Sequence, residues 1–197
     1  SKSLKLARQL GNNVEMANNF SRLSGLNIEM LEYEKALEHL FQADSLYKAS
    51  GDEQGISNIL VNTAIVYRKQ GKFDLARKNL EQALKYYREQ NHAEGLMVTW
   101  QILAELYDLE GEKESALTYY DSSLVLAEKA GDGRRMMENY WKLFLLYSSE
   151  EDYKNALHYH TLLRTLEDSL FDIGKIQLGY ELDLIFDLKE KNIEETV

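Results

Sequence analysis

The sequence of 197 residues contains no cysteine and no proline. Without cysteine there is neither a disulfide bond nor a thiol nucleophile, and the redox compartment of the protein cannot be inferred. Without proline, no residue removes a backbone donor from the interior of a helix. The absence of proline therefore suits a fold of long, uninterrupted helices.

A long hydrophobic run is also missing. The best candidate, around Leu143 to Tyr147, is too short to cross a bilayer, so we expect no membrane span in this segment. Residues Ser1 to Asn12 include basic residues but no apolar core, which excludes a signal peptide from this segment only. The compartment stays undetermined: it is cytoplasmic or, if the segment belongs to a membrane sensor, extracytoplasmic.

Positive charge is scarce relative to negative charge. The chain has 23 lysine and arginine residues against 33 aspartate and glutamate residues, a formal net charge of −10. An acidic surface repels phosphate backbones, so we expect no nucleic-acid binding by this segment. The charge favours basic or neutral partners, while the oligomeric state cannot be predicted.

What the sequence does contain is a repeat of forty residues. Ala76 falls on Ala36, Ala116 and Ala156 when the chain is shifted by multiples of forty. A fixed period of this size predicts stacked supersecondary units. We therefore predict an all-α solenoid of antiparallel helix pairs, in which neighbouring units cover each other's apolar faces. The predicted units are 13–52, 53–92, 93–132 and 133–172, preceded by the end of a truncated repeat (1–12) and followed by a C-terminal capping or connecting helix (173–197).

Each unit reads as helix, short turn, helix. In the second unit, Gly71 and Lys72 make the turn. Glycine and asparagine accept the left-handed conformation just past a helix end. The residues expected to stop the second helices are Gly11, Gly51, Asn91 and Gly131. The residues expected in the core of this unit, at helical spacing, are Leu60, Thr63, Ala64, Tyr67, Phe73, Ala76, Leu80, Ala83 and Tyr87.

This pattern resembles the tetratricopeptide repeat (TPR). The matching residues of the second unit are Leu60, Ala64, Tyr67, Gly71, Ala76, Leu80 and Ala83. The period is forty instead of the usual 34, as in a longer-helix variety of the family, and the usual late proline is missing. The resemblance implies a right-handed superhelix and a non-catalytic scaffold that binds proteins or peptides.

A narrower resemblance covers Leu163 to Glu195. It is similar to the junction of bacterial TPR sensor histidine kinases or transcriptional regulators, in which a motif like Asp168 to Phe171 ends the last repeat. Gly174 and Gly179 make the following helix less regular than that junction. This similarity implies a larger bacterial signalling protein, with this segment as its sensor or interaction region.

In TPR arrays the first helix of each unit lines a concave groove. The groove residues that this implies are Asn58, Val61, Asn62, Ile65, Arg68, Gln101, Glu105, Asp108, Trp141, Lys142 and Leu145. Asn58 and Asn62 either grip a peptide backbone or are solvated polar residues. Trp141 either anchors a partner, with Leu145 one turn on, or packs against the C-terminal helix. The carboxylate clamp of some TPR proteins is not predicted, because Ser21 and Gly25 replace its lysine and asparagine.

No pattern of active-site chemistry stands out. Glu105 and Asp108 share a helix face, but an acidic patch on a wet surface is the simpler interpretation. His158 and His160 are two residues apart and are poor joint ligands for zinc, whereas His160 fits a core position. We therefore predict no catalytic, metal-binding or cofactor-binding residues, and no cofactor.

Three functions follow, in order of preference. The first is a peptide-binding or protein-binding scaffold that passes its state to an output module of a signalling protein. The second is a free-standing adaptor or assembly scaffold. The third, a remote alternative, is an enzyme, for which the sequence offers no constellation of the necessary kind.

Overall fold

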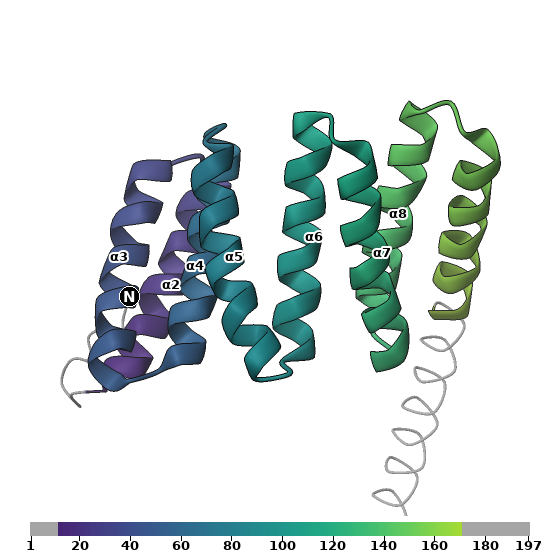
Figure 1. Cartoon of the computed structure of the whole chain (residues 1–197). Helices are drawn as coiled ribbons and strands as arrows, with labels where there is room; N and C mark the ends of the chain where they lie inside the picture. The colour runs from purple at the N-terminus through teal and green to yellow at the C-terminus, as the bar shows by residue number, and fades with distance from the viewer. Residues whose placement is uncertain (1–11, 171–197) are drawn as a thin grey trace, which may run out of the picture. The chain divides into compact units, whose positions relative to one another are not determined.

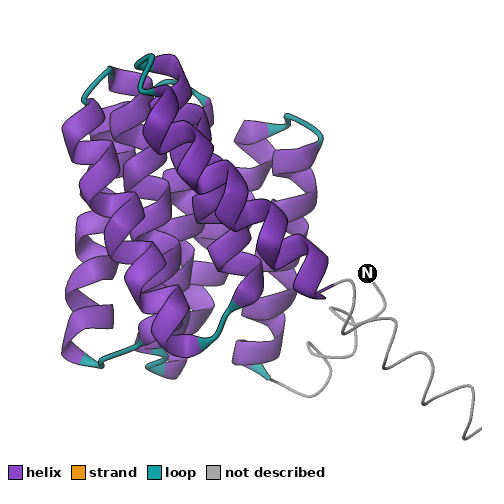
Figure 2. Ribbon diagram, turned by 90° about the vertical axis from the view of Figure 1, so that its right-hand side faces the viewer, coloured by secondary structure: helices purple, strands orange, loops and turns teal. Residues whose placement is uncertain are grey.

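The computed structural model describes residues 12–170, all of which lie in helices or in the short turns between them. Within each compact part of the chain, successive helices run antiparallel (Figure 1), and short loops join them (Figure 2). The all-α fold of paired helices is thereby confirmed. The helices are α2 (Asn13–Glu29), α3 (Tyr33–Ser50), α4 (Glu53–Lys69), α5 (Phe73–Glu89), α6 (Ala93–Glu110), α7 (Lys113–Ala130), α8 (Gly133–Ser149) and an unlabelled helix over residues 153–170.

The chain divides into two compact parts, Ser1–Leu126 and Ala127–Val197, which we describe separately. From here on, the first unit and the second unit mean these two parts and not the predicted repeats. The predicted repeat end at 1–12, with its stop at Gly11, lies outside the described residues except for Asn12. The predicted C-terminal helix (173–197) also lies outside them, as does most of the junction that follows Asp168. In the described part of the chain, no helix is both long and apolar enough to cross a membrane.

Side-chain caps set where the first helix of each pair begins. The side chain of Asp52 accepts a hydrogen bond from the Gly55 backbone N–H at 2.8 Å, at the start of α4. Asn12, His92 and Asp132 cap α2, α6 and α8 in the same way. Each cap satisfies a backbone donor that the first turn leaves free, a contribution of about 1 kcal/mol. The caps recur every forty residues, so the period of the sequence is also the period of the helix starts.

The turns depend on left-handed residues. Gly51, Asn91 and Gly131, three predicted stops, have φ angles of +69°, +49° and +65°. The turns within helix pairs use the same conformation, at Gly71 and at three further residues with positive φ: Leu31, Gly111 and Glu151. For an L-residue this conformation costs about 1–2 kcal/mol, a strain that Leu31 and Glu151 accept and that glycine avoids.

The core of the second predicted unit differs in part from the prediction. Ala64, Ala76, Leu80, Ala83 and Tyr87 are buried as expected. The residues that are only half-buried are Leu60, Thr63, Tyr67 and Phe73. The physical reason for the partial exposure of Leu60, Thr63 and Tyr67 is a cavity of about 350 Å³, lined by α3, α4 and α5, that reaches their side chains.

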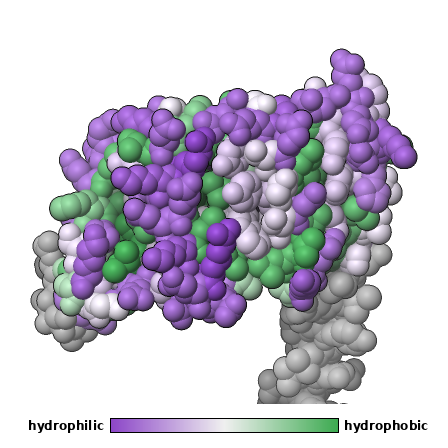
Figure 3. All heavy atoms as spheres, viewed as in Figure 1, coloured by the Kyte–Doolittle hydropathy of each residue, from purple (hydrophilic) through white to green (hydrophobic). Residues whose placement is uncertain are grey.

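Hydrophilic side chains cover much of the face seen in Figure 3, and hydrophobic ones show between them.

The core position predicted for His160 is also wrong. Leu80 and Tyr120, at the matching positions of earlier repeats, are buried, whereas His160 is exposed. Its ring lies 5.3 Å from that of Phe144, and among the described residues no further helix follows to cover it. Ala156 and Leu163 are the buried residues of this last described helix.

Two tyrosine–glycine contacts hold successive helix pairs together in the first unit. A Cβ atom on Gly55 would lie 2.3 Å from Cδ1 of Tyr47, and one on Gly95 would lie 2.4 Å from Cδ1 of Tyr87. Both tyrosines are almost fully buried, so their rings cannot swing away. Each ring thus packs directly against the backbone of the next helix, at an approach that only glycine permits.

In the second unit, the positions forty residues after Tyr87 and Gly95 carry a small residue in place of the large one and a large residue in place of the small one. Ala127 stands where Tyr47 and Tyr87 stand, and Arg135 stands where Gly55 and Gly95 stand. Both are buried, and Arg135 Nε lies 3.4 Å from Asp132 Oδ2. The small and the large residue have therefore exchanged helices, which keeps the summed side-chain volume of the pair near that of the tyrosine pairs.

We expect Gly55→Ala to lower the free energy of unfolding by about 1–3 kcal/mol, because the added methyl group overpacks the contact with Tyr47. Gly25→Ala is the matched control, since Gly25 lies in α2 with no atom within 4 Å of its added Cβ. This control should gain up to about 1 kcal/mol from helix propensity. Urea denaturation measures both variants, and a gain in stability for Gly55→Ala would contradict the contact.

Candidate binding face on helices α2, α4 and α6

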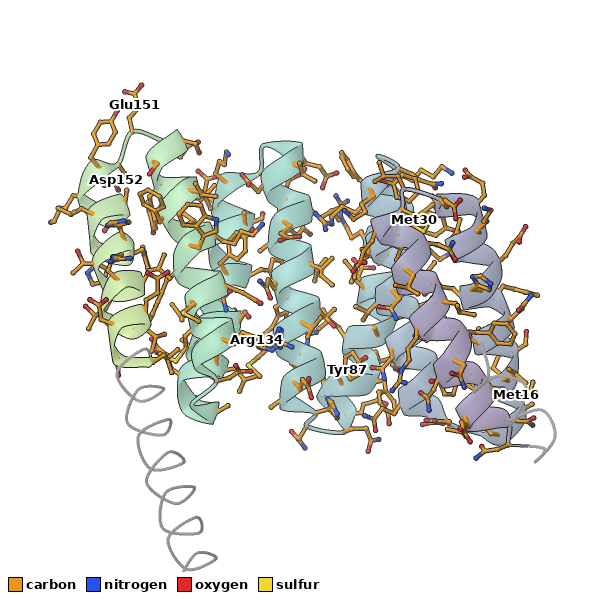
Figure 4. The ribbon with its side chains drawn as sticks, turned by 180° about the vertical axis from the view of Figure 1, so that it is seen from behind. Met16, Met30, Tyr87, Arg134, Glu151 and Asp152 are labelled. Carbon is orange, nitrogen blue, oxygen red and sulfur yellow. The ribbon has the colours of Figure 1, made fainter. Side chains whose placement is uncertain are left out.

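A polar cavity opens on one face of the first unit. It has a volume of about 340 Å³ and lies where α2 contacts α4 and α4 contacts α6. We call this surface the groove face; Figure 4 shows the molecule from the side on which α2 lies in front. The residues that line the cavity are Asn18, Ser21, Tyr47, Gln54, Asn58, Val61, Asn62, Tyr87, His92, Glu94, Gly95 and Val98.

Two tyrosine–asparagine pairs connect the core to this cavity. The hydroxyl of Tyr47 donates to Oδ1 of Asn18 at 2.6 Å, and that of Tyr87 donates to Oδ1 of Asn58 at 2.7 Å. Asn18 and Asn58 are exposed and forty residues apart, so the same arrangement occurs in two successive helix pairs. Each tyrosine fixes the orientation of an asparagine amide, which keeps an NH₂ group for other partners.

His92 lies at the edge of the cavity and starts α6. Its Nδ1 accepts the backbone N–H of Gly95 at 2.9 Å, so the side chain caps this helix. Nε2 lies 3.2 Å from the side-chain amide of Gln54 on α4, and the ring lies 5.4 Å from that of Tyr87. The histidine therefore joins three helices of the first unit around the cavity.

Three of the predicted groove residues line this cavity together: Asn58, Val61 and Asn62. Asn62 donates from Nδ2 to the Ser21 hydroxyl at 3.3 Å, which links α4 to α2. Val61 is only 6% exposed, so it forms part of the cavity floor. Ile65 is half-buried and packs against the core of the unit.

Three of the other predicted residues of α4 and α6 form ion pairs. Arg68 lies 2.9 Å from Glu105, which joins the two helices, and Asp108 lies 2.7 Å from Lys113. Gln101 is half-buried on the same helix. Both carboxylates are thus neutralised by cations, which disfavours their use as a catalytic acid and base.

The predicted residues of α8 belong to the second unit. Trp141 and Leu145 are 46% and 44% exposed, and Lys142 beside them is half-buried. Trp141 lies 5.4 Å from the ring of Phe144 and lines a shallow cavity of about 470 Å³. The helix predicted after Asp172, the alternative packing partner for Trp141, lies outside the described residues.

Sequence reasoning missed several residues of the cavity. Asn18 was overlooked although it lies forty residues before Asn58, and the recurrence of the pair was the signal that could have found it. Tyr87 was predicted to be buried, without any expectation that its hydroxyl reaches the groove face. For Gln54, His92 and Glu94 the sequence carried no signal, because their roles depend on how adjacent helix pairs stack.

Comparison with known proteins agrees with the repeat pattern. Residues 55–129 match the family model of the tetratricopeptide repeat. The Arabidopsis thaliana protein kinesin light chain-related 1 is 28% identical over 132 residues, which cover 64% of this chain and 22% of that protein. The chain thus spans less than a quarter of the length of this relative.

Solved structures share the helical solenoid fold. BtubC (BKLC) from P. vanneervenii has a TM-score of 0.69 at 17% identity, covering 81% of this chain and 66% of that one. Aspartyl phosphate phosphatase F from Bacillus subtilis has a TM-score of 0.64 at 21% identity, covering 83% of this chain and 44% of that one. A Rap protein complexed with competence and sporulation factor has a TM-score of 0.62 at 15% identity, covering 86% and 57%. At these identities the likeness shows the fold alone.

The buried tyrosines predict how stability depends on alkaline pH. Burial, followed by the charges of Tyr86 and Glu94, raises the pKa of Tyr87 to about 12. Burial likewise raises the pKa of Tyr120, helped by Glu105 and Asp108. The folded state therefore holds protons that the unfolded state releases near pH 10, so stability is complete below about pH 10 and falls as pH rises toward about 12.

We expect the Tyr87→Phe variant to have a lower melting temperature than the wild type at about pH 8, because it loses the hydrogen bond to Asn58. Above about pH 10, its melting temperature should fall less steeply with pH than that of the wild type. Thermal denaturation followed by circular dichroism measures both effects. Tyr153→Phe, at a residue that is 68% exposed, is the matched control and should keep the wild-type slope. Identical slopes for all three proteins would contradict this account.

Proposed function

Because this chain is a tetratricopeptide repeat protein, we propose that it is a non-catalytic scaffold that binds an extended peptide segment of a partner. The binding surface is the groove face of the first unit. The observation that carries the proposal is the set of asparagine amides around the cavity of about 340 Å³, contributed by Asn18, Asn58 and Asn62.

Asparagine suits this task because one side-chain amide both donates and accepts, as a peptide unit does. Packed helices lie about 8–10 Å apart, and an extended peptide advances about 3.3 Å per residue. Asn18 on α2 and Asn58 on α4 therefore meet every third residue of a peptide that crosses the helices. The tyrosine hydroxyls hold both amides in place before binding, which lowers the entropy lost on association.

The apolar floor of the cavity supplies the second part of the interaction. Val61 and Val98 line it between the amides, and the bodies of the two buried tyrosines lie beneath. A bound segment would thus find backbone hydrogen bonds on the rim and a small apolar contact in the middle, as in other peptide grooves. This mixture favours a short segment of modest affinity.

The proposal also extends to the kind of protein that contains this chain. The Rap protein with a similar fold is described as complexed with competence and sporulation factor, which supports a regulatory scaffold for this chain as well. We propose that the four predicted repeats form the sensor or interaction region of a larger bacterial signalling protein. The alternative is a free-standing adaptor, and the native reading frame beyond Val197 distinguishes them.

Trp141, Lys142 and Leu145 remain a separate candidate for partner binding. Their two large apolar side chains are exposed on α8, and such residues are frequent anchors of protein interfaces. They belong to the second unit, so we treat them as independent of the groove face.

We expect Asn62→Ala to weaken peptide binding by about 2- to 12-fold, the cost of one lost hydrogen bond. The probe is a fluorescent peptide selected from a displayed library of random ten-residue sequences by the full chain, and polarisation gives the Kd. Asn79→Ala is the matched control, because Asn79 lies on α5 and donates to the Leu75 carbonyl away from the cavity. Equal losses for both variants, or a library that yields no binder, would contradict the proposed function.

A further inference from the structure

The cap at the start of α6 differs in chemistry from the caps at the matching positions of the other repeats. Those positions are Asn12, Asp52 and Asp132, and each of these residues caps its helix through a side-chain oxygen. His92 instead caps α6 through an imidazole nitrogen. An amide does not ionise and carboxylates change charge below about pH 5, whereas histidine changes charge between about pH 5 and pH 8. The start of α6 therefore depends on a group that titrates near neutral pH.

This cap requires the neutral ring. Nδ1 of His92 accepts the backbone N–H of Gly95 at 2.9 Å, and a protonated imidazole carries hydrogen on both ring nitrogens. Two donors would then face each other, because a backbone N–H cannot accept. The contact of Nε2 with Gln54, at 3.2 Å, adapts to either state, since a glutamine amide offers an oxygen or an NH₂ group. The half-buried ring is open to solvent, so proton uptake breaks the cap and spares the second contact.

The cap lies next to the groups that shape the cavity. Gly95 lines the cavity, and Tyr87 packs against its backbone. The backbone N–H of His92 donates to the Tyr87 carbonyl at 2.9 Å, and the two rings lie 5.4 Å apart. Because the Tyr87 hydroxyl holds the amide of Asn58, a displacement of the first turn of α6 changes the orientation of a proposed peptide contact.

The cavity has few other titratable groups. Among the described residues that line it, α2 and α4 contribute none, and the ones besides His92 are Tyr47 of α3, Tyr87 of α5 and Glu94 of α6. Burial raises the pKa of both tyrosines, so they stay neutral throughout the range in which histidine titrates. Carboxylates as a class change charge below this range. The imidazole is therefore the lining group whose charge changes between about pH 5 and pH 8.

We propose that His92 makes peptide binding at the groove face sensitive to pH. With the ring neutral, the cap holds the first turn of α6 and the cavity is ready for a peptide. With the ring protonated, the cap is released and the affinity falls. This inference rests on the proposed function and names the regulation of that same site.

The direction of the effect follows from the geometry. Proton uptake and the cap exclude each other, so the cap is complete at about pH 8 and is lost as the pH falls toward about 5. This acid transition is separate from the alkaline one of the buried tyrosines.

Polarisation measurements of the Kd at about pH 7.5 and about pH 5.5 test the proposal. The peptide is selected by the full chain from a library without histidine, aspartate and glutamate, and both its termini are blocked, so that the protein alone titrates. We expect the wild type to bind about two- to tenfold more weakly at the lower pH, the effect of one lost cap. His92→Asp, which introduces the residue type of Asp52 and Asp132, should change by less than about twofold.

His39→Gln is the matched control, because His39 is the other histidine of the first unit. Its Nδ1 lies 2.8 Å from Oδ1 of Asn27, an acceptor, so a protonated ring keeps this contact. This variant should retain the wild-type ratio of the two affinities. The inference is overturned if His92→Asp also retains that ratio, or if the wild type binds equally well at both pH values.

The backbone amide signal of Gly95 reports the cap without any peptide. In the wild type it should move with the same pH midpoint as the ring signals of His92, and in His92→Asp it should stay in place over this range. If it does not follow the ring, the account of the cap is wrong.

The two measurements separate the possible failures. If the Gly95 signal follows His92 but the affinity does not change with pH, the regulation is wrong while the proposed function stands. If no peptide is selected at all, the proposed function fails and the inference fails with it.

Discussion

The packing of a tyrosine ring against a glycine backbone is the contact on which the first unit depends. Tyr47 lies on Gly55 and Tyr87 lies on Gly95, so each ring joins one helix pair to the next. The same two rings end in hydroxyls that hold Asn18 and Asn58 on the groove face. One side chain thus stabilises the stack and orients the groups proposed to meet a peptide. A repeat protein needs such contacts because no helix pair covers its own apolar face.

This dual role explains at which positions the later repeat differs from the earlier ones. In the second unit the tyrosine and glycine give way to Ala127 and Arg135, which exchanges the sizes of the two residues. No tyrosine hydroxyl is then available at that position to orient an amide, and Val98 stands where Asn18 and Asn58 stand in the earlier helices. The cavity therefore ends at α6. Regular packing and local chemistry are coupled through these positions.

Much of the fold was predictable because its determinants are local and periodic. The left-handed turns at Gly51, Asn91 and Gly131 and the buried alanines follow from residue type and spacing alone. The half-exposed Tyr67 and the exposed His160 did not follow, since their burial depends on how closely a neighbouring helix approaches. For the same reason the place of His92 beside Gln54 and Tyr87 could not be predicted, because it arises from the arrangement of three helices. Periodicity predicts which face of a helix is apolar, but the gap between helices decides which residues reach water.

The central claim is that a peptide binds at the oriented amides of the groove face, and nuclear magnetic resonance tests it most directly. The side-chain NH₂ signals of the asparagines are followed while a selected peptide is added. The account predicts that the signals of Asn18, Asn58 and Asn62 shift together in proportion to occupancy, while those of Asn79 and Asn155 stay in place. Shifts confined to Asn139 and Asn155 in the second unit, or to Asn79 on α5, would contradict it.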